Sequence, residues 1–293
     1  MPESPAPLWV EHSNIMGTLY IVGTPIGNLE DLTPRAARIL GQVDLVAAED
    51  TRVTRGLLTH LGVRARLISY HLHNWQRRMP TLLEALAKGD VALVTDAGMP
   101  GISDPGSELV AQAAAQGFEV DVAPGPSSVT TALAVSGLDA DSFIFLGFLP
   151  RRAKQRRERL GSVKDAADTL VIFESPHRFR QSVEALLAVL GDRQAAVCRE
   201  LTKLHQEVFR GTLSQALEHF DEPRGEFVLV VAGASGPDDA SQRSLSEQGQ
   251  EDAAVTLAQL KQEGVPAKDA VATVGDALGL PRNTLYRIWL QLP

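Results

Sequence analysis

The sequence predicts an α/β protein made of two consecutive three-layer domains and a small helical domain. In residues 17–124, and again in 125–233, short apolar runs rich in β-branched residues alternate with helical patterns. Residues 234–252 are rich in Gly, Ser, Asp and Gln, which is the composition of a linker. Residues 253–293 return to helical periodicity. In the first domain, strands that alternate with helices indicate a largely parallel sheet covered on both faces.

In the first domain we expect strands at 18–22, 44–50, 91–96 and 118–124. The helical patterns between them cover 33–41, 79–89 and 107–117. Each pattern ends in Gly, which tolerates the left-handed conformation that follows many helices. Thr33 and Pro34 suit the N-cap and the first position of the first helix.

In the second domain we expect strands within 142–150, 168–176, 195–201 and 225–233, with helices from about 127, at 177–190 and at 213–220. Thr212 and Gln215 form a capping-box pattern before the last of these helices. The tail carries two helices around a Gly-Leu-Pro break at 279–281, a helix-turn-helix-like outline. This tail is either a small helical cap or a surface that contacts nucleic acid.

Composition limits the classes of protein to which the chain can belong. The 293 residues are 44% hydrophobic and carry a net charge of -8, which is typical of a globular protein and argues against nonspecific binding of nucleic acid by the whole surface. Cys198 is the only cysteine, which excludes an intrachain disulfide and fits a reducing compartment. Residues 1–16 have neither the basic nor the apolar part of a signal peptide and are expected to be a flexible extension. We find no apolar run long enough for a membrane span, so we expect a cytoplasmic protein without a membrane partner.

The first glycine-containing loop, "GTPIGN" at 23–28, follows the first expected strand. Pro25 stands where a dinucleotide-binding loop has its middle glycine, and proline has no backbone N–H to donate to a phosphate. The loop also lacks the Gly-Lys-Ser/Thr ending of a P-loop. These differences argue against a pyrophosphate site.

Two later loops have a composition that suits a ligand site. "TDAGMPGISDPG" at 95–106 and "APGPSSVTTA" at 123–132 both follow expected parallel strands, and ligands of open α/β sheets bind beyond the carboxyl ends of such strands. Turn formation alone also favours these residue types. Ser127 or Ser128 could cap the helix that begins there, or could offer a hydroxyl and N–H groups to a ligand.

A series of motifs follows these loops in a fixed order. They are "VGTPIGNLEDLTPRA" (22–36), "AAEDTRVTRGLL" (47–58), "DAGMPGISDPG" (96–106), "PGPSS" (124–128), "GFLPR" (147–151), "FESPHR" (173–178) and "RELTKLHQEVFRGTL" (199–213). With them, residues 17–233 resemble the tetrapyrrole-methylase family of S-adenosylmethionine-dependent methyltransferases. Pro25 and Asn28 depart from the glycine-rich pattern of that family's first loop. The departures resemble one branch, the bacterial enzymes that methylate a cytidine 2'-hydroxyl in the decoding region of the 16S ribosomal RNA. The tail resembles the small helical domain of that branch.

The resemblance implies that S-adenosylmethionine lies in a cleft between the two α/β domains, held largely by backbone groups. Carbonyl oxygens suit its sulfonium cation, which makes Pro25 tolerable. The implied cofactor contacts are Pro25, Ile26, Asp96, Ala97, Gly98, Met99, Pro100, Gly101, Ser127, Ser128, Val129, Phe173, Glu226 and Phe227. No metal is expected, since His71 and His73 have no further ligands at a suitable spacing.

A ribose hydroxyl is a weak acid, so its methylation calls for a positioned base. Among the candidates, we favour Asp50 or Glu200; the others are Glu49, His71, His73, Asn74, Lys203 and His205. The alternative for each carboxylate is an ordinary helix-end or surface position.

RNA contact is predicted from the basic run at 151–159, which contains one acidic residue. The alternative is a solvated helix face or a mobile loop. The predicted phosphate contacts are Arg151, Arg152, Lys154, Arg156 and Arg157, with Arg52 and Arg55 as additions.

Three functions are therefore compared. The first is a ribosomal RNA ribose 2'-O-methyltransferase that acts on 16S RNA, within the 30S subunit, and forms a homodimer as the resemblance implies. The second is a tetrapyrrole C-methyltransferase of the same fold, which needs neither the basic run nor the helical tail. The third is a binding module for nucleotides or nucleic acid without enzymatic activity.

Overall fold

The computed structural model describes residues 17–234, 252–278 and 282–292. The chain divides into two compact units, Met1–Gly233 and Ala234–Pro293. The predicted extension at 1–16, most of the predicted linker at 234–252 and the break at 279–281 lie outside the described residues. No helix in the described ranges is long and apolar enough to cross a membrane.

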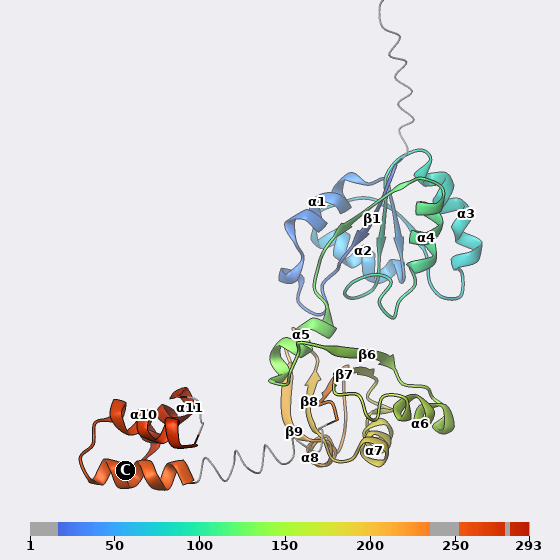
Figure 1. Ribbon diagram of the computed structural model, residues 1–293. Coiled ribbons are helices and arrows are strands. Elements are labelled where there is room, and N and C mark those ends of the chain that lie inside the picture. The colour runs from blue at the N-terminus through green and yellow to red at the C-terminus, as the bar shows by residue number, and fades with distance from the viewer. Residues whose placement is uncertain (1–16, 235–251, 279–281, 293) are drawn as a thin grey trace, which may run out of the picture. The chain divides into compact units, whose positions relative to one another are not determined.

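The first half of the larger unit contains a five-stranded sheet in which every pair of neighbours is parallel, in the order β3-β2-β4-β1-β5. The strands are β1 (Thr18–Val22), β2 (Leu45–Ala48), β3 (Arg66–Ser69), β4 (Val91–Val94) and β5 (Glu119–Ala123). The helices are η1 (Leu29–Asp31), α1 (Pro34–Gln42), α2 (Thr51–His60), α3 (Trp75–Leu86) and α4 (Ser107–Ala115). One apolar cluster joins α1 and α2 to the sheet and another joins α3 and α4 to it, so the sheet is covered on both faces (Figure 1).

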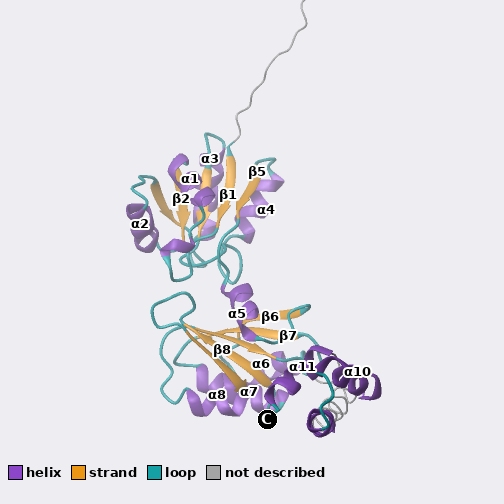
Figure 2. Ribbon diagram, turned by 90° about the vertical axis from the view of Figure 1, so that its left-hand side faces the viewer, coloured by secondary structure: helices purple, strands orange, loops and turns teal. Residues whose placement is uncertain are grey.

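The second half contains a mixed five-stranded sheet in the order β6-β7-β10-β8-β9, in which only β6 and β7 are parallel. Its strands are β6 (Phe143–Phe148), β7 (Thr169–Glu174), β8 (Gln194–Arg199), β9 (Glu207–Thr212) and β10 (Phe227–Val231). Its helices are α5 (Ser128–Ser136), α6 (Ala153–Gly161), α7 (Phe179–Leu190) and α8 (Leu213–His219). Figure 2 shows α7 and α8 together on one face of this sheet.

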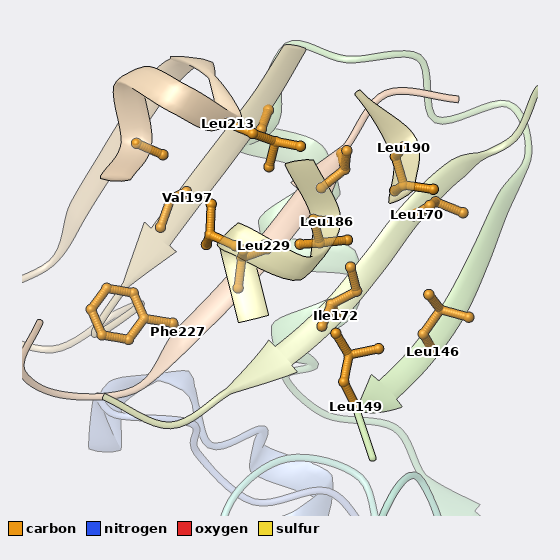
Figure 3. Packing of buried hydrophobic residues seen from close by; sticks show 14 of the residues in the cluster. Leu146, Leu149, Leu170, Ile172, Leu186, Leu190, Val197, Leu213, Phe227 and Leu229 are labelled. Atoms are coloured by element: carbon orange, nitrogen blue, oxygen red, sulfur yellow. The ribbon is translucent and has the colours of Figure 1, made fainter. Parts of the chain in front are cut away.

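The core of the second half lies between this sheet and α7 and α8 (Figure 3). Leu186 of α7 and Leu213 of α8 are fully buried against Leu229 of the central strand β10. Each buried leucine contributes about 1.5–3 kcal/mol relative to an exposed one. On the opposite face, Ile26 of the first loop packs in one cluster with Val129 of α5 and sheet residues. The first loop is therefore anchored against the second sheet.

The smaller unit contains a helix at 252–262, α10 (Ala267–Leu278) and α11 (Arg282–Gln291). Ala253, Leu257, Val271, Val274 and Leu285 are buried in one apolar cluster of this unit. The helices thus bury their own apolar faces within the unit.

Several local predictions are confirmed. Thr33 caps α1 with Pro34 behind it, and Thr212 and Gln215 form the expected capping box. The prediction for two helix-ending glycines is wrong: Gly41 lies inside α1, and Gly89 follows α3 without a positive φ, whereas Gly117 adopts φ 82 after α4. The strands β3 and β9 were not expected, because their residues are mostly half-exposed and form no continuous apolar run.

Candidate active site

A cavity of about 490 Å³ opens where the loops of the first half meet the second sheet. Glu49 directly follows β2 and Thr95 directly follows β4, so both lie at the carboxyl ends of parallel strands. The second sheet contributes Phe173 and Phe227, from neighbouring strands β7 and β10. The predicted contacts that line the cavity are Ile26, Asp96, Ala97, Gly98, Met99, Ser127, Ser128, Val129, Phe173, Glu226 and Phe227.

Three predicted contacts, Pro25, Pro100 and Gly101, are not among the residues that line this cavity. Pro25 instead lines a second cavity of about 260 Å³. The first loop is held in place by the second: Thr24 N–H donates to Gly98 O at 2.9 Å, and Gly98 N–H donates back to Thr24 O at 3.1 Å. The two loops therefore form one wall between the cavities.

A glycine is needed at position 23 because two segments of the backbone lie very close together there. A Cβ at Gly23 would lie 2.7 Å from Gly125 Cα, which is closer than real Cβ contacts come. The end of β1 and the third loop thus touch through their backbones. This glycine serves backbone packing, which agrees with the absence of a phosphate-binding pattern in the first loop.

Five acidic residues line the large cavity: Glu49, Asp96, Asp104, Glu174 and Glu226. The first three come from the first half of the unit and are close enough to affect one another's charge. Glu49 accepts a hydrogen bond of 2.6 Å from Thr95 Oγ1. Burial, reinforced by the charges of Glu49 and Asp96, raises the pKa of Asp104 to about 6. Burial also raises the pKa of Asp96. This wall therefore favours a cationic ligand, whose charge would stabilise the ionised carboxylates.

The opposite part of the cavity is apolar. Phe148 and Phe173 pack edge to face with ring centroids 5.6 Å apart, and Phe148 is 55% exposed. Met99 and Val129 extend this surface. Such a wall suits the flat ring of an adenine, since aromatic side chains pack well against planar groups. A cofactor that joins a cation to an adenosine therefore fits the residues present.

The third loop ends at α5, where Ser127 occupies the N-cap position but makes no capping hydrogen bond through its side chain. The structure therefore does not show the capping role for the Ser127 side chain, and its contact with a ligand stays a prediction. The first N–H groups of a helix have no partner within it, so Ser128 and Val129 bring donors to the same wall.

Asp50, one of the two favoured bases, lies outside both cavities. It caps α2 by accepting from Arg52 N–H at 2.8 Å, and its carboxylate binds the Arg52 guanidinium at 2.6 Å. Hydrogen bonds from Arg52 lower the pKa of Asp50 to about 2. A carboxylate with so low a pKa is a poor proton acceptor, so these contacts argue against Asp50 as the base.

Glu200, the other favoured base, also does not line either cavity. Its Oε1 accepts from Glu226 N–H at 2.8 Å and from Lys203 Nζ at 3.0 Å. Burial raises the pKa of Glu200, but these two donors outweigh that effect and hold it below its usual value. Gly225, at φ 84, leaves the space that the Glu200 side chain occupies. Glu200 thus holds the turn between β8 and β9 against the residues that precede β10.

Of the remaining candidates, Glu49 lines the large cavity and Lys203 pairs with Glu200 and Glu226. His71, His73 and Asn74 lie together in one turn. Asn74 accepts from His71 N–H at 2.9 Å and donates to Ser69, and His73 N–H donates to His71 Nδ1 at 3.2 Å. Neither His71, His73 nor His205 lines a described cavity. Within the residues that the structure describes, no group of His, Cys, Asp or Glu side chains could hold a metal ion.

The basic run forms helix α6 and the residues before it. Arg151, Arg152, Lys154 and Arg157 are exposed, as are Arg52 and Arg55 on α2. Arg156 differs: it is 4% exposed, and its guanidinium donates to Pro150 O and Arg151 O, each at 3.3 Å. The prediction that Arg156 contacts RNA is therefore withdrawn, because its side chain holds the preceding loop to the helix.

Some residues that line the cavity were not predicted from the sequence. Phe148, Ser175 and Asp104 line the cavity and lay inside or next to motifs that had been recognised. Ser175 is positioned by Glu174, which is 2% exposed, accepts from Ser175 N–H at 2.8 Å and pairs with Arg178 at 3.6 Å. Arg178 in turn donates to Leu149 O, so the "FESPHR" and "GFLPR" motifs are joined behind the cavity.

Comparison with known proteins places this site in a family. The model of the tetrapyrrole (corrin/porphyrin) methylases matches residues 18–217, and the model described as the RsmI C-terminal HTH domain matches residues 247–293. The fold is similar to that of a diphthine synthase (TM-score 0.60, 18% identity, 74% of this chain and 89% of that one). It is also similar to a uroporphyrin-III-C-methyltransferase from Thermus thermophilus (TM-score 0.52, 24% identity, 74% and 94%).

Curated relatives are similar over most of the chain. Three proteins named ribosomal RNA small subunit methyltransferase I are among them. That of Halalkalibacterium halodurans is 44% identical, over 94% of this chain and 95% of its own length. That of Escherichia coli O157:H7 is 42% identical, over 95% and 96%. That of Thermotoga maritima is 49% identical, over 74% and 99%. The chain therefore belongs to the tetrapyrrole methylase family and, within it, to the ribosomal RNA small subunit methyltransferase I group.

Proposed function

We propose that this protein transfers a methyl group from S-adenosylmethionine to the ribose 2'-hydroxyl of a cytidine in the decoding region of 16S ribosomal RNA. The observation that carries the proposal is a cavity lined by both carboxylates and aromatic rings, in a member of a ribosomal RNA methyltransferase group. The cytidine and the 2'-hydroxyl follow from the resemblance of the motifs. The exposed basic residues of α6 support an RNA substrate over a tetrapyrrole.

S-adenosylmethionine supplies an electrophilic methyl group on a sulfonium when it is bound. The residues of the chain have three tasks. The carboxylates of Glu49 and Asp104 hold positive charge in the cavity, and Phe148 and Phe173 exclude water from it. The third task is to accept the proton of the acceptor hydroxyl.

We propose that Asp96 accepts this proton. Asp96 lines both cavities, whereas Asp50 and Glu200 line neither. Its Oδ1 accepts from Asp50 N–H at 2.9 Å, which fixes the carboxylate at the junction of the cavities. Because burial raises the pKa of Asp96, this carboxylate is a stronger base than that of Asp50, whose pKa is about 2.

The proposed partners are the 30S subunit and a second copy of this chain. The proposed location is the cytoplasm, where ribosomal subunits are assembled. Light scattering of the purified protein measures the oligomeric state, and a single-chain mass would refute the dimer. Binding of labelled protein to 30S subunits in a sedimentation assay tests the other partner.

The experiment that tests the function supplies methyl-labelled S-adenosylmethionine with one of three acceptors. These are 30S subunits, protein-free 16S RNA, and a tetrapyrrole precursor. We expect label in the RNA, in a nucleoside that resists alkaline cleavage because its 2'-hydroxyl is methylated. Label in the tetrapyrrole alone would favour the C-methyltransferase, and the absence of label from every acceptor would favour a binding module.

A further inference from the structure

The second cavity, of about 260 Å³, lies beside the large one and shares Thr95 and Asp96 with it. Its other walls are the first loop, with Pro25 and Leu29, and one side of helix α2. Of these walls, the sequence predicted only the first loop to lie beside the acceptor; no such part was predicted for the residues of α2 that line the cavity. The two cavities therefore meet at Asp96, the carboxylate that we propose as the proton acceptor.

Gly56 lines this second cavity from the interior of α2. Glycine is among the least favourable residues in a helix interior, so its presence there calls for a reason. The backbone does not provide one, because Gly56 does not have a positive φ. Packing does not provide one either, because a Cβ at this position would meet no atom of the chain within 4 Å. The space that a side chain would take is the space of the cavity.

The walls around Gly56 contain exposed apolar side chains, and basic side chains lie outside the cavity on the same helix. Leu29 is 46% exposed and Val53 is 49% exposed, although both are large apolar side chains. Arg52 and Arg55 lie exposed on the same helix, and the Arg52 guanidinium is held by Asp50 at 2.6 Å. A ligand with a flat, partly apolar ring on a phosphate-bearing chain matches this combination. A nucleotide turned out of an RNA strand has that chemistry.

We propose that the second cavity is the subsite for the acceptor nucleoside. The base lies between the first loop and α2, against Leu29 and Val53. The ribose lies at the junction with the large cavity, where Asp96 reaches its 2'-hydroxyl. Gly56 is a positioning residue: because it has no side chain, it leaves room for the base on the surface of α2. This inference rests on the proposed function, because it names where the proposed substrate binds.

The test compares Gly56→Ala and Gly56→Leu with the wild type. Gly41→Ala is the matched control, because Gly41 is also exposed in a helix, a Cβ there would make only an ordinary contact of 3.5 Å, and α1 lines neither cavity. We expect Gly56→Ala and Gly41→Ala each to raise the midpoint of thermal unfolding, by about 2 °C. Calorimetry with S-adenosylmethionine should give the wild-type Kd for every variant.

Methylation of 30S subunits should separate the variants. We expect kcat/KM to fall by about 100-fold in Gly56→Leu, less in Gly56→Ala, and not at all in Gly41→Ala, since small displacements of a reacting group have effects of that size. Wild-type kcat/KM in Gly56→Leu would overturn the inference and leave the proposed function standing. A loss of S-adenosylmethionine affinity in Gly56→Leu as large as its loss of kcat/KM would also overturn the inference. If the wild type labels no RNA at all, the proposed function fails first.

Discussion

Asp104→Asn is expected to stabilise the protein at pH 8 by removing a carboxylate that is unfavourable in the fold. Burial, with the charges of Glu49 and Asp96 nearby, raises the pKa of Asp104 from 3.8 to about 6. The folded chain therefore binds this proton more tightly than the unfolded chain does. The free energy of unfolding consequently falls as the pH rises from about 4 to about 6, and the loss is complete above that range.

The size of the effect follows from the two pKa values. The difference corresponds to at most about 3 kcal/mol. Asp104 is only half-buried, so solvent screens part of this interaction, and we expect about 1 kcal/mol. That stabilisation would raise the unfolding midpoint by about 2–4 °C in a protein of this size. The carboxylate would be retained despite its cost because a cationic ligand in the cavity stabilises its ionised form.

Scanning calorimetry of the wild type and Asp104→Asn at pH 8 and pH 5 is the assay. The increase should be largest at pH 8 and smaller at pH 5, where Asp104 is largely protonated in the fold. A lower midpoint for the variant at pH 8, or an equal difference at both pH values, would refute the reasoning. Calorimetric binding adds a second measurement: the variant should lose more affinity for S-adenosylmethionine than for S-adenosylhomocysteine, which has no sulfonium charge.

Three other expectations follow from the site. Asp96→Asn should lower kcat for 30S methylation by at least about 100-fold, whereas Asp50→Asn should retain most of it; the opposite ranking in single-turnover assays would exchange the two roles. Replacing the exposed arginines Arg151, Arg152 and Arg157 together by Ala should weaken RNA binding and lower its salt dependence, by about 0.7 in logarithmic slope for each lost phosphate contact. Unchanged RNA affinity across a salt titration would remove α6 from the RNA surface. Arg156→Ala should instead destabilise the fold, by about 1–3 kcal/mol in urea unfolding, because it removes a buried side chain and the hydrogen bonds that it donates to two backbone carbonyls.

Much of the fold was predictable because buried elements leave a local signal. The strands β1, β2, β4 and β10 are apolar runs, and the alternation of the first three with helices indicated the parallel sheet of the first half. The mostly antiparallel pairing of β10 and its neighbours in the second sheet left no such signal. The loops that follow β4 and β5 were predicted to contact a ligand because each comes directly after a parallel strand. Most of the residues named in them line the large cavity. The strands β3 and β9 left a weaker signal, because their residues are mostly half-exposed and do not form a continuous apolar run.

The chemistry of individual side chains was less predictable. Arg156 and Arg157 are adjacent in one basic run, yet one is buried against backbone carbonyls and the other is exposed. Asp50 and Asp96 are both loop aspartates, yet a pairing with Arg52 lowers the pKa of the first and burial raises that of the second. These differences depend on which face of an element meets the rest of the chain.

The sequence by itself determined the α/β class, the order of the elements, the capping of α1 and α8, and the three loops that surround the site. Each of these depends on residues within a few positions of one another, through burial periodicity and short-range hydrogen bonds. Only the tertiary structure decided the strand order, the raised pKa of Asp104, and the second cavity at Gly56. Those properties depend on distances between residues far apart in the chain, because electrostatic interactions and cavities form only where separate segments meet.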